Sequence, residues 1–560
     1  MLWNFVWKSA YYDSVTLMRL TRDLEAVPGV RRAATMMGTP QNRALLKDAG
    51  LLGADGEAAS PNDLLIAVAA DDEASARAAE AAVRAALTAR PSPGDRRTAA
   101  RPRSLDSALR VLPDATLALI SVPGLYAGAE ARKALAAGLH VMLFSDNVPV
   151  ETEVELKRLA IARDLFLMGP DCGTAIVNGV PLGFANAVPR GRIGIAAASG
   201  TGLQEVACLV AAAGEGISHA IGVGGRDLSD AVGGLMMERA LAALARDPAT
   251  EAVCVIGKPP GPSVARRLET LARTLGKPCV VHFVGGAPSQ AGPVSLEQPT
   301  TLGDCRSIEE RRGFAEARRA SGGVIEERRG FAEAVRASRG VWGAISGPPM
   351  SLEDAARAAV ALVRGERFTS VEFTAPAAEI DRLVGDATRG QAASQRFVRG
   401  VYSGGTLAWE ARGLLAATLG EVAPGVTGGG AGHRVVDLGD DVFTVGRPHP
   451  MIDGTVRRQW IEKEGDDPST SVLLLDVVLG YGAHPDPAGE LLPALEAARQ
   501  RARAAGRRLT VVASVCGTPD DPQPRAAQVA SLNAAGVIVM PSNAQAARLA
   551  ARVAAKAGRG

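Results

Sequence analysis

The sequence predicts a multidomain α/β protein built from parallel sheets, preceded by a small α+β domain. Through most of the 560 residues, apolar runs of strand length alternate with stretches of helical spacing. Aromatic residues make up only 4% of the chain while Gly occurs 63 times, and small residues suit closely packed α/β layers. Two Gly-rich segments, at 199–202 and 403–406, each follow an apolar run and open a helical stretch. This repetition predicts a duplicated module.

Residues 1–90 predict an α+β domain of ferredoxin or ACT type. The expected strands are Phe5–Tyr11, Val30–Met37 and Leu64–Ala69, and the expected helices are Ser14–Leu24 and Glu73–Leu87. The charged, Pro-containing stretch 91–103 ends this domain.

The remaining chain divides into three α/β segments joined by polar connections. Residues 104–187 predict a partial Rossmann-like domain, with strands at Leu117–Val122, His140–Phe144 and Leu165–Met168 and helices at Ala127–Ala137 and Glu151–Arg163. Residues 188–296 predict a flavodoxin-like domain, with strands near Ile193–Ala198, Ala220–Val223, Ala252–Ile256 and Cys279–Phe283. Residues 396–555 repeat this plan, with strands near 397–402, 434–437, Val472–Val478, Leu509–Ser514 and Val537–Met540. We therefore expect two pseudo-symmetric domains.

An Arg/Glu-rich linker at 297–350 and a helical connector at 351–395 join the two copies. The linker contains the decapeptide I-E-E-R-R-G-F-A-E-A twice, at 308–317 and 325–334. A bound repeat peptide or regulatory element is one interpretation; slippage in a tolerant linker is the simpler one, because loops accept insertions at little cost. We assign the duplication no function.

Bulk composition excludes several classes of function. The 62 basic and 60 acidic residues nearly cancel, which argues against a nucleic-acid surface. The six cysteines are scattered without a C-x-x-C pair, as expected for reduced thiols in a cytoplasmic protein. The first residues do not have the pattern of a signal peptide, and no apolar run has the length of a membrane span. We expect a cytoplasmic protein with no membrane partner.

The two Gly-rich segments predict an anion site. A strand–turn–helix junction leaves backbone N–H groups free at the positive end of the helix dipole. The predicted phosphate-binding residues are Ser199, Gly200, Thr201, Gly202, Ser403, Gly404, Gly405 and Thr406. We expect the two turns to face each other across one phosphate-sized ligand.

An ordered series of motifs resembles the succinyl-CoA synthetase family. G-P-D-C-G-T-A-I (169–176), G-R-I-G-I-A-A-A-S-G-T (191–201), I-G-V-G-G (221–225) and V-C-V-I-G (253–257) resemble its α subunit. The segments at 403–407, 435–441 and 472–482 resemble the CoA-ligase domain of its β subunit. One chain with both halves, a small N-terminal domain and the segments V-G-R-P-H-P-M-I-D (445–453) and L-G-Y-G-A-H-P-D-P-A-G (479–489) is similar to the FdrA proteins of the acyl-CoA synthetase superfamily. The resemblance covers roughly residues 104–290 and 395–550.

Three departures from that family bear on the chemistry. The family's phosphorylated His is absent from the segment after 280–286, and His282 reads as a core residue within its strand. Lys258 occupies the turn where the family has a Glu, and an ammonium attracts phosphate directly, although an exposed lysine at a strand end is the alternative. The Gly-rich loop that cradles CoA in the family is not visible, nor is an ATP-grasp domain. CoA therefore stays open as a ligand, and we assign no other cofactor.

Several polar residues lie where open α/β sheets bind ligands. Arg226 and Asp227 follow a strand, and Arg447 precedes His449, so we predict that they bind substrate. Lys258, His449 and His484 are the predicted catalytic residues. A metal site formed by the two histidines with Asp453 and Asp486 matches no known ligand spacing, and we predict no metal. Cys516 is either a nucleophile or, more commonly for such a position, a buried thiol.

These features predict acyl transfer from an acyl phosphate. The resemblance to FdrA proteins implies carbamoyl transfer between carbamoyl phosphate and oxamate in allantoin breakdown, with additional protein subunits or a homo-oligomer. The acceptor would be a small carboxylate or amide that attacks the carbonyl directly, while the helix ends and Lys258 stabilise the departing phosphate. One alternative is an ADP-forming acyl-CoA synthetase with its phosphohistidine relocated to His449 or His484. The other is a non-catalytic regulatory subunit with a vestigial anion pocket.

Overall fold

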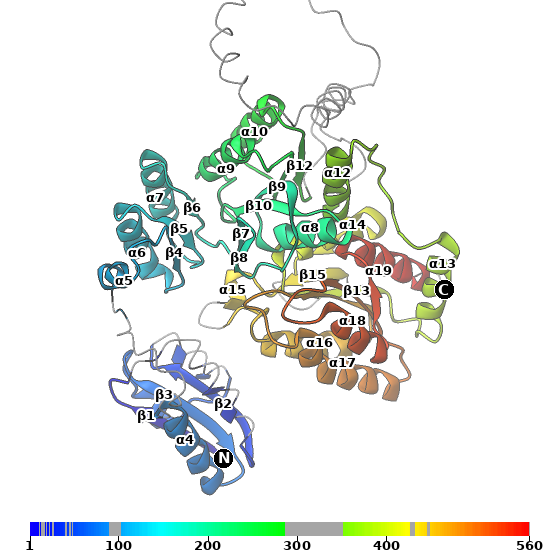
Figure 1. The fold of residues 1–560 in the computed structure, drawn as a ribbon. Helices are drawn as coiled ribbons and strands as arrows, with labels where there is room; N and C mark the ends of the chain where they lie inside the picture. The colour runs from blue at the N-terminus through cyan, green and yellow to red at the C-terminus, as the bar shows by residue number, and fades with distance from the viewer. Residues whose placement is uncertain are drawn as a thin grey trace, which may run out of the picture. The chain divides into compact units, whose positions relative to one another are not determined.

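The computed structural model describes residues 1–88 (with short gaps between residues 11 and 48), 102, 104–285, 351–425, 432–444 and 448–558. It divides into two compact units, Met1–Ser104 with Thr444–Pro448 and Leu105–Phe443 with His449–Gly560. The elements of each are shown in Figure 1. The predicted linker with its duplicated decapeptide lies outside the described residues.

The first unit is a three-stranded antiparallel sheet covered by a helix. Its elements are β1 (Leu2–Trp7), β2 (Val30–Met37), α3 (Ala54–Glu57), β3 (Leu64–Ala70) and α4 (Glu73–Thr88). The strand order is β1-β3-β2, and the apolar central strand β3 is almost wholly buried. Alanines on one side of α4, Ala76 and Ala79, pack with Val83 against this sheet. The α+β architecture is thus confirmed, with β1 starting earlier than predicted; the expected helix Ser14–Leu24 lies largely outside the described residues.

A three-stranded parallel sheet opens the second unit. Its elements are α5 (Leu105–Val111), β4 (Leu117–Ile120), α6 (Gly124–Ala136), β5 (His140–Leu143), α7 (Val150–Ala162) and β6 (Leu167–Met168). The parallel strand order β4-β5-β6 agrees with the predicted partial Rossmann-like sheet. Its buried face shares one hydrophobic cluster with the next sheet, including Val141 and Val253.

The first large sheet has six strands in the order β12-β11-β9-β10-β7-β8. Its elements are β7 (Thr174–Val177), β8 (Val180–Gly183), β9 (Arg190–Ala198), α8 (Gly200–Ala212), β10 (Ile217–Gly222), α9 (Leu235–Arg246), β11 (Ala252–Gly257), α10 (Pro262–Thr274) and β12 (Cys279–Phe283). The four strands β9–β12 are parallel, as predicted. The antiparallel hairpin β7–β8 was not predicted; its turn residues Asn178 and Gly179 both have positive φ.

The second large sheet repeats the plan in the order β14-β15-β13-β16-β17-β18. Its elements are β13 (Phe397–Tyr402), α14 (Gly405–Leu419), β14 (Val422–Ala423), β15 (His433–Asp437), α15 (Asp441–Thr444), α16 (Thr455–Asp466), β16 (Thr470–Val478), α17 (Pro487–Ala504), β17 (Thr510–Cys516), α18 (Arg525–Ala534), β18 (Ile538–Met540) and α19 (Asn543–Ala557). The core order β17-β16-β13-β15 matches β12-β11-β9-β10 of the first sheet. The predicted pseudo-symmetry is therefore present in the strand order.

Four helices lie between the two large sheets. They are α8 and α14, which follow the Gly-rich turns, together with α19 and α12 (Leu352–Arg364); α13 (Ala377–Thr388) packs on α19. One hydrophobic cluster includes apolar residues of both sheets, such as Ile195 and Leu474. Shared burial of this kind makes the two halves one core and holds their strand ends together.

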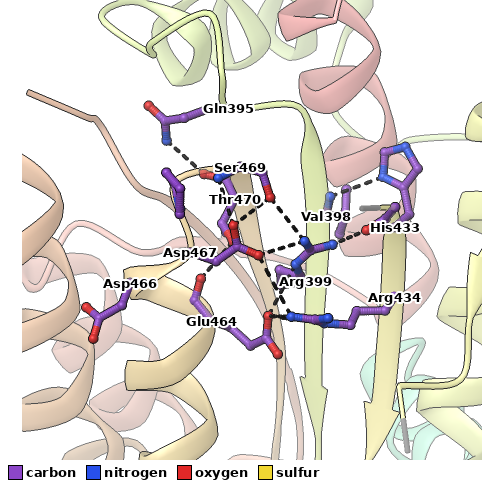
Figure 2. Close-up of polar contacts among 12 residues, drawn as sticks. Gln395, Val398, Arg399, His433, Arg434, Glu464, Asp466, Asp467, Ser469 and Thr470 are labelled. Carbon is purple, nitrogen blue, oxygen red and sulfur yellow. Dashed lines mark hydrogen bonds and ion pairs between the residues drawn. The ribbon is translucent and has the colours of Figure 1, made fainter. Parts of the chain in front are cut away.

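A buried ion network lies at the other end of the second sheet (Figure 2). Arg399 in β13 is almost fully buried; its Nη2 donates to Asp467 Oδ2 at 2.8 Å, and its Nε lies 3.2 Å from Glu464 Oε2. Arg434 in the adjacent β15 shares the same Glu464 carboxylate at 2.5 Å. These ion pairs link the first residues of β13 and β15 to Glu464 and Asp467. The carboxyl ends of the same strands lie away from this network, on the side where a site is expected.

Candidate functional site

The two Gly-rich turns meet, as the sequence predicts. Ser199 is the N-cap of α8, and its Oγ accepts a hydrogen bond from the Gly202 N–H at 2.9 Å. The same Ser199 hydroxyl donates to Thr406 Oγ1 in the first turn of α14 at 2.6 Å. A Cβ built on Gly404 would lie 3.0 Å from Thr201 Cγ2. Close approach of the two turns therefore depends on their small residues.

The donors of the second turn are partly used within the chain. Asp476, buried at the end of β16, accepts the N–H groups of Ser403 at 2.9 Å and Gly404 at 2.7 Å. Its carboxylate also accepts from the Arg457 guanidinium at 2.6 Å. Two of the predicted phosphate donors are thus already bonded, which corrects the expectation that this whole turn is open. The N–H groups of Gly405 and Thr406 have no acceptor among the described residues.

Carboxylates and one lysine surround the meeting point. Burial raises the pKa of Asp437, at the end of β15, to about 6, and the nearby Lys258 opposes that rise. Burial also raises the pKa of Asp171 to about 7, assisted by Asp441 and opposed by Lys258 among others. Lys258 follows β11, is exposed, and has its Nζ 5.9 Å from the Trp409 ring centre. The predicted Lys258 is thus placed beside two carboxyl groups that titrate near neutral pH.

His449 lies beside the second turn. Its Nδ1 accepts the Met451 N–H at 3.2 Å, its ring centre is 5.6 Å from that of Phe184, and burial lowers its pKa to about 4. A Cβ on Gly439 would lie 2.8 Å from His449 Nε2 and 3.2 Å from Asp437 Oδ1. The imidazole is therefore neutral at neutral pH and close to Asp437.

His484 lies behind the second turn. It lines a small cavity with Ser403, Arg457 and Glu490 among others. Its Nδ1 accepts the Asp486 N–H at 3.1 Å and lies 4.0 Å from Glu490 Oε2. The structure thus places His484 near Ser403 and beside residues of α16 and α17, and its catalytic role stays a prediction.

Two of the predicted substrate-binding residues, Asp227 and Arg226, are bonded within the fold. Asp227 is fully buried, where it accepts Lys157 Nζ at 2.7 Å and the N–H groups of Met236 at 3.1 Å and Met237 at 2.9 Å. Both of its oxygens are used, so the structure gives Asp227 an internal role in place of the predicted one. Arg226 pairs with Glu153 Oε2 at 3.0 Å and with the Val148 carbonyl. Arg447 lies outside the described residues.

Two further sequence interpretations concern buried residues. His282 is 5% exposed, as expected for a core residue, and burial lowers its pKa to about 4. The Cys516 thiol is buried against Cys208, and that contact together with burial raises its pKa well above the usual value. A buried, protonated thiol fits the packing interpretation.

Sequence reasoning missed Asp171, Thr174, Asp437 and Asp476. Asp171 and Thr174 belong to the G-P-D-C-G-T segment, and Asp437 and Asp476 end or lie within parallel strands. A polar residue at the carboxyl end of a predicted parallel strand was the available signal. Among the described residues, no helix has both the length and the apolar character to cross a membrane.

Two family descriptions match the chain. The CoA-ligase family matches residues 401–553, and "AllF, heavy metal-associated domain" matches residues 1–102. Residues 1–102 contain no Cys and no His. Thiolates and imidazoles are the usual ligands of soft metals, so these residues do not fit a heavy-metal site of that kind.

The chain is also similar to curated proteins. It is 36% identical over 552 residues to "Uncharacterized protein YahF" of Escherichia coli, covering 97% of this chain and 96% of that one. It is 33% identical over 187 residues to the succinate–CoA ligase [ADP-forming] subunit alpha-2 of Trichomonas vaginalis, covering 32% of this chain and 59% of the relative. It is 30% identical over 168 residues to the ADP-forming sulfoacetate-CoA ligase subunit SqwL of Acholeplasma sp, covering 29% and 55%.

A comparison with solved structures matches the dinucleotide-forming acetyl-coenzyme A synthetase 1 of Ca. Korarchaeum cryptofilum. It is 16% identical and covers 79% of this chain and 84% of its own, with a TM-score of 0.27. The CoA-ligase match falls on the second of the two halves described above, and the relative from E. coli matches nearly the whole chain. The chain belongs to the family of E. coli YahF, within the acyl-CoA synthetase and succinyl-CoA ligase-like superfamily.

Proposed function

We propose that the chain transfers an acyl group from an acyl phosphate to an acceptor where α8 and α14 begin. The observation that carries this proposal is the meeting of two helix N-termini, with backbone N–H groups still available at each and a lysine beside them. Anions bind at such helix ends because the N–H groups and the helix dipole both favour negative charge. The names of the succinate–CoA and sulfoacetate–CoA ligase relatives favour a CoA thiol as the acceptor.

The reaction needs no covalent enzyme intermediate. The thiol sulfur attacks the acyl carbon, the carbon–oxygen bond to phosphate breaks, and inorganic phosphate leaves with that electron pair. The thiol proton passes to a base, for which Asp437 is suited by its half-buried position beside the second turn and its pKa of about 6. The helix N–H groups and Lys258 stabilise the departing phosphate. This half-reaction requires neither a phosphohistidine nor an ATP-binding domain.

Carbamoyl transfer from carbamoyl phosphate to oxamate is the second candidate. The observation that favours it is the short sheet β4-β5-β6, which is only part of a Rossmann-type nucleotide-binding sheet. An amide acceptor would not need the missing part. The chemistry at the phosphate is the same, with the acceptor nitrogen in place of sulfur.

The test is acceptor-dependent phosphate release. Full-length protein is mixed with acetyl phosphate and CoA, or with carbamoyl phosphate and oxamate, and inorganic phosphate is followed by ³¹P NMR. Isothermal titration with inorganic phosphate runs in parallel. We expect phosphate to bind and one pair to turn over. Absence of both phosphate binding and release would contradict the proposed function.

A further inference from the structure

We propose that the anion binds at the α8 end of the site, where the Thr174 hydroxyl acts as a third donor, and that the α14 end receives the acceptor. This inference rests on the proposed function and specifies how its site is divided. The ligand group is a tetrahedral oxyanion, namely the phosphoryl end of an acyl phosphate. The two turns resemble each other in sequence, but their surroundings differ.

The α14 end already holds carboxylates of the chain. Asp476 occupies the N–H groups of Ser403 and Gly404. Asp437 lies on the other side, and a Cβ on Gly405 would be 2.4 Å from its Oδ2. A phosphate dianion placed here would be repelled by the negative charge of Asp437. Solvent screens this repulsion only weakly in a partly buried site. A donor group of an acceptor, such as a thiol or an amide NH₂, is the better match.

The α8 end has donors and no carboxylate bonded to them. The N–H groups of Gly200 and Thr201 have no acceptor among the described residues, because the Gly202 N–H is the one helix N–H that the Ser199 hydroxyl accepts. Ala198 and Ser199 lead straight from β9 into the helix, so these two N–H groups point out of the strand end. They supply two of the donors that a phosphoryl group needs.

Thr174 supplies an independent observation. It is 1% exposed in β7, and its Oγ1 has no hydrogen-bond partner among the described residues. An unpaired buried hydroxyl costs stability, so such groups usually mark a missing partner. Outside the adjoining backbone of its own helix, a Cβ built on Gly200 would have only this Oγ1 within 4 Å, at 3.5 Å. The space beside Gly200 is therefore open, and Thr174 borders it.

These facts place three donors around one open space. The Gly200 N–H, the Thr201 N–H and the Thr174 O–H come from β7 and the start of α8. An anion bound here would accept the hydrogen bond of the Thr174 hydroxyl, which has no partner among the described residues. Lys258 neutralises the remaining charge from the side of β11.

The experiment is calorimetric titration of the full-length protein and its variants with inorganic phosphate. Thr174→Val removes the hydroxyl at nearly constant volume and should weaken phosphate binding at least tenfold, whereas Thr174→Ser should restore most of it. Gly200→Ala puts a methyl group in the open space and should weaken binding as well. Gly413→Ala is the matched control, because a Cβ there meets nothing within 4 Å on α14.

The outcomes separate this inference from the proposed function. Wild-type binding that Thr174→Val and Gly200→Ala both leave unchanged overturns the division of the site, while the proposed function stands. Absence of phosphate binding by the wild-type protein overturns this inference, and absence of acceptor-dependent phosphate release as well overturns the proposed function. Weakening by Thr174→Val with rescue by Thr174→Ser supports the inference, and circular dichroism confirms that each variant is folded.

Discussion

Glu205 and Glu410 occupy equivalent positions in the two halves, and each accepts a hydrogen bond from the first residue of a helix in the other half. Glu205, in α8, accepts the N–H of Asn543 at the start of α19, at 3.0 Å. Glu410, in α14, accepts the N–H of Leu352 at the start of α12, at 2.6 Å. Glu410 also accepts Asn543 Nδ2 at 2.7 Å. The Glu205–Asn543 and Glu410–Leu352 contacts are therefore equivalent under the pseudo-symmetry that relates the two halves.

This exchange links the site to the interface between the halves. Both carboxyls lie on the helices whose N-termini meet at Ser199 and Thr406, and both are at most 4% exposed. A carboxylate at a helix N-terminus is favourable because it meets unpaired N–H groups and the positive end of the dipole. We infer that the pair fixes the relative position of α8 and α14.

The first prediction concerns the pH dependence of folding stability. Burial raises the pKa of Glu410 to about 7, assisted by Glu205 and opposed by the Leu352 N–H, Asn543 and Arg548. Because the folded-state pKa of Glu410 is raised, the folded protein binds the Glu410 proton more tightly than the unfolded chain does. The stability that this difference provides is fully present below about pH 4.5 and is lost as pH rises through 7. The free energy of unfolding should therefore fall between pH 5 and pH 8 by up to about 3 kcal/mol through this group. Glu410→Gln should flatten that slope.

The measurement for Glu410 is urea unfolding at both pH values. Glu496→Gln, at an exposed position of α17, is the control and should keep the wild-type slope. Equal slopes for wild type and Glu410→Gln would show that Glu410 keeps an ordinary pKa.

The second prediction concerns Lys258. Lys258→Ala should weaken phosphate binding about tenfold, because it removes the one cation placed between Asp171 and Asp437 whose charge affects both. Isothermal titration measures this. Lys463→Ala is a matched control, since Lys463 also lies near a Trp ring, with its Nζ 4.4 Å from the Trp460 centre. Unchanged affinity in Lys258→Ala would remove Lys258 from the site.

The arrangement of strands was largely predictable, because buried parallel strands appear as continuous apolar runs. Strands Val30–Met37 and Cys279–Phe283 have the predicted bounds. The hairpin β7–β8 was missed because its two strands are short and flank a tight turn. The meeting of Ser199 with Thr406 followed from the duplicated turns.

The electrostatics of the site were not predictable in the same way. Asp227 comes shortly after a strand and Asp437 ends one. Asp227 nevertheless binds the buried Lys157, whereas Asp437 lies beside Gly405 in the second turn. Asp476 lies within the sequence of an apolar strand, 73 residues from the turn that it bonds. Which carboxylate meets which N–H group depends on side-chain placement across strands, and a single sequence does not specify it.

The third prediction concerns Asp437 as a base. Its pKa of about 6 means that the acyl-transfer rate should rise between pH 5 and pH 7 and then level off. Asp437→Asn should remove that rise and lower kcat about a hundredfold, in line with typical losses of a general base. The rate of phosphate release against pH measures both effects. A wild-type profile without the rise would exclude Asp437 as the base.

The fourth prediction concerns Gly405. Its φ is not positive, and a Cβ built on it would lie 2.4 Å from Asp437 Oδ2. Gly405→Val should push the Asp437 carboxylate aside and lower acyl-transfer activity at least tenfold. Gly413→Val, on an exposed position of the same helix, should leave activity unchanged. Full activity in Gly405→Val would show that Asp437 has room to move.

The last prediction concerns the ion network in Figure 2. Arg399 pairs with Glu464 and Asp467 and has almost no exposure, so removing it takes one of two arginines from the buried Glu464 carboxylate and the 2.8 Å ion-pair partner from Asp467. Arg399→Met should lower the free energy of unfolding by about 3–5 kcal/mol, the usual loss when one member of a buried pair is removed. Arg501→Met, which breaks exposed pairs with Glu462 and Asp466, should cost under about 1 kcal/mol. Urea unfolding at constant pH compares the two variants. Folded Arg399→Met should bind phosphate with the affinity of the wild type, because the network lies at the opposite end of the strands from Ser403. A loss of phosphate affinity in a variant that remains folded would mean that the network also positions the second turn.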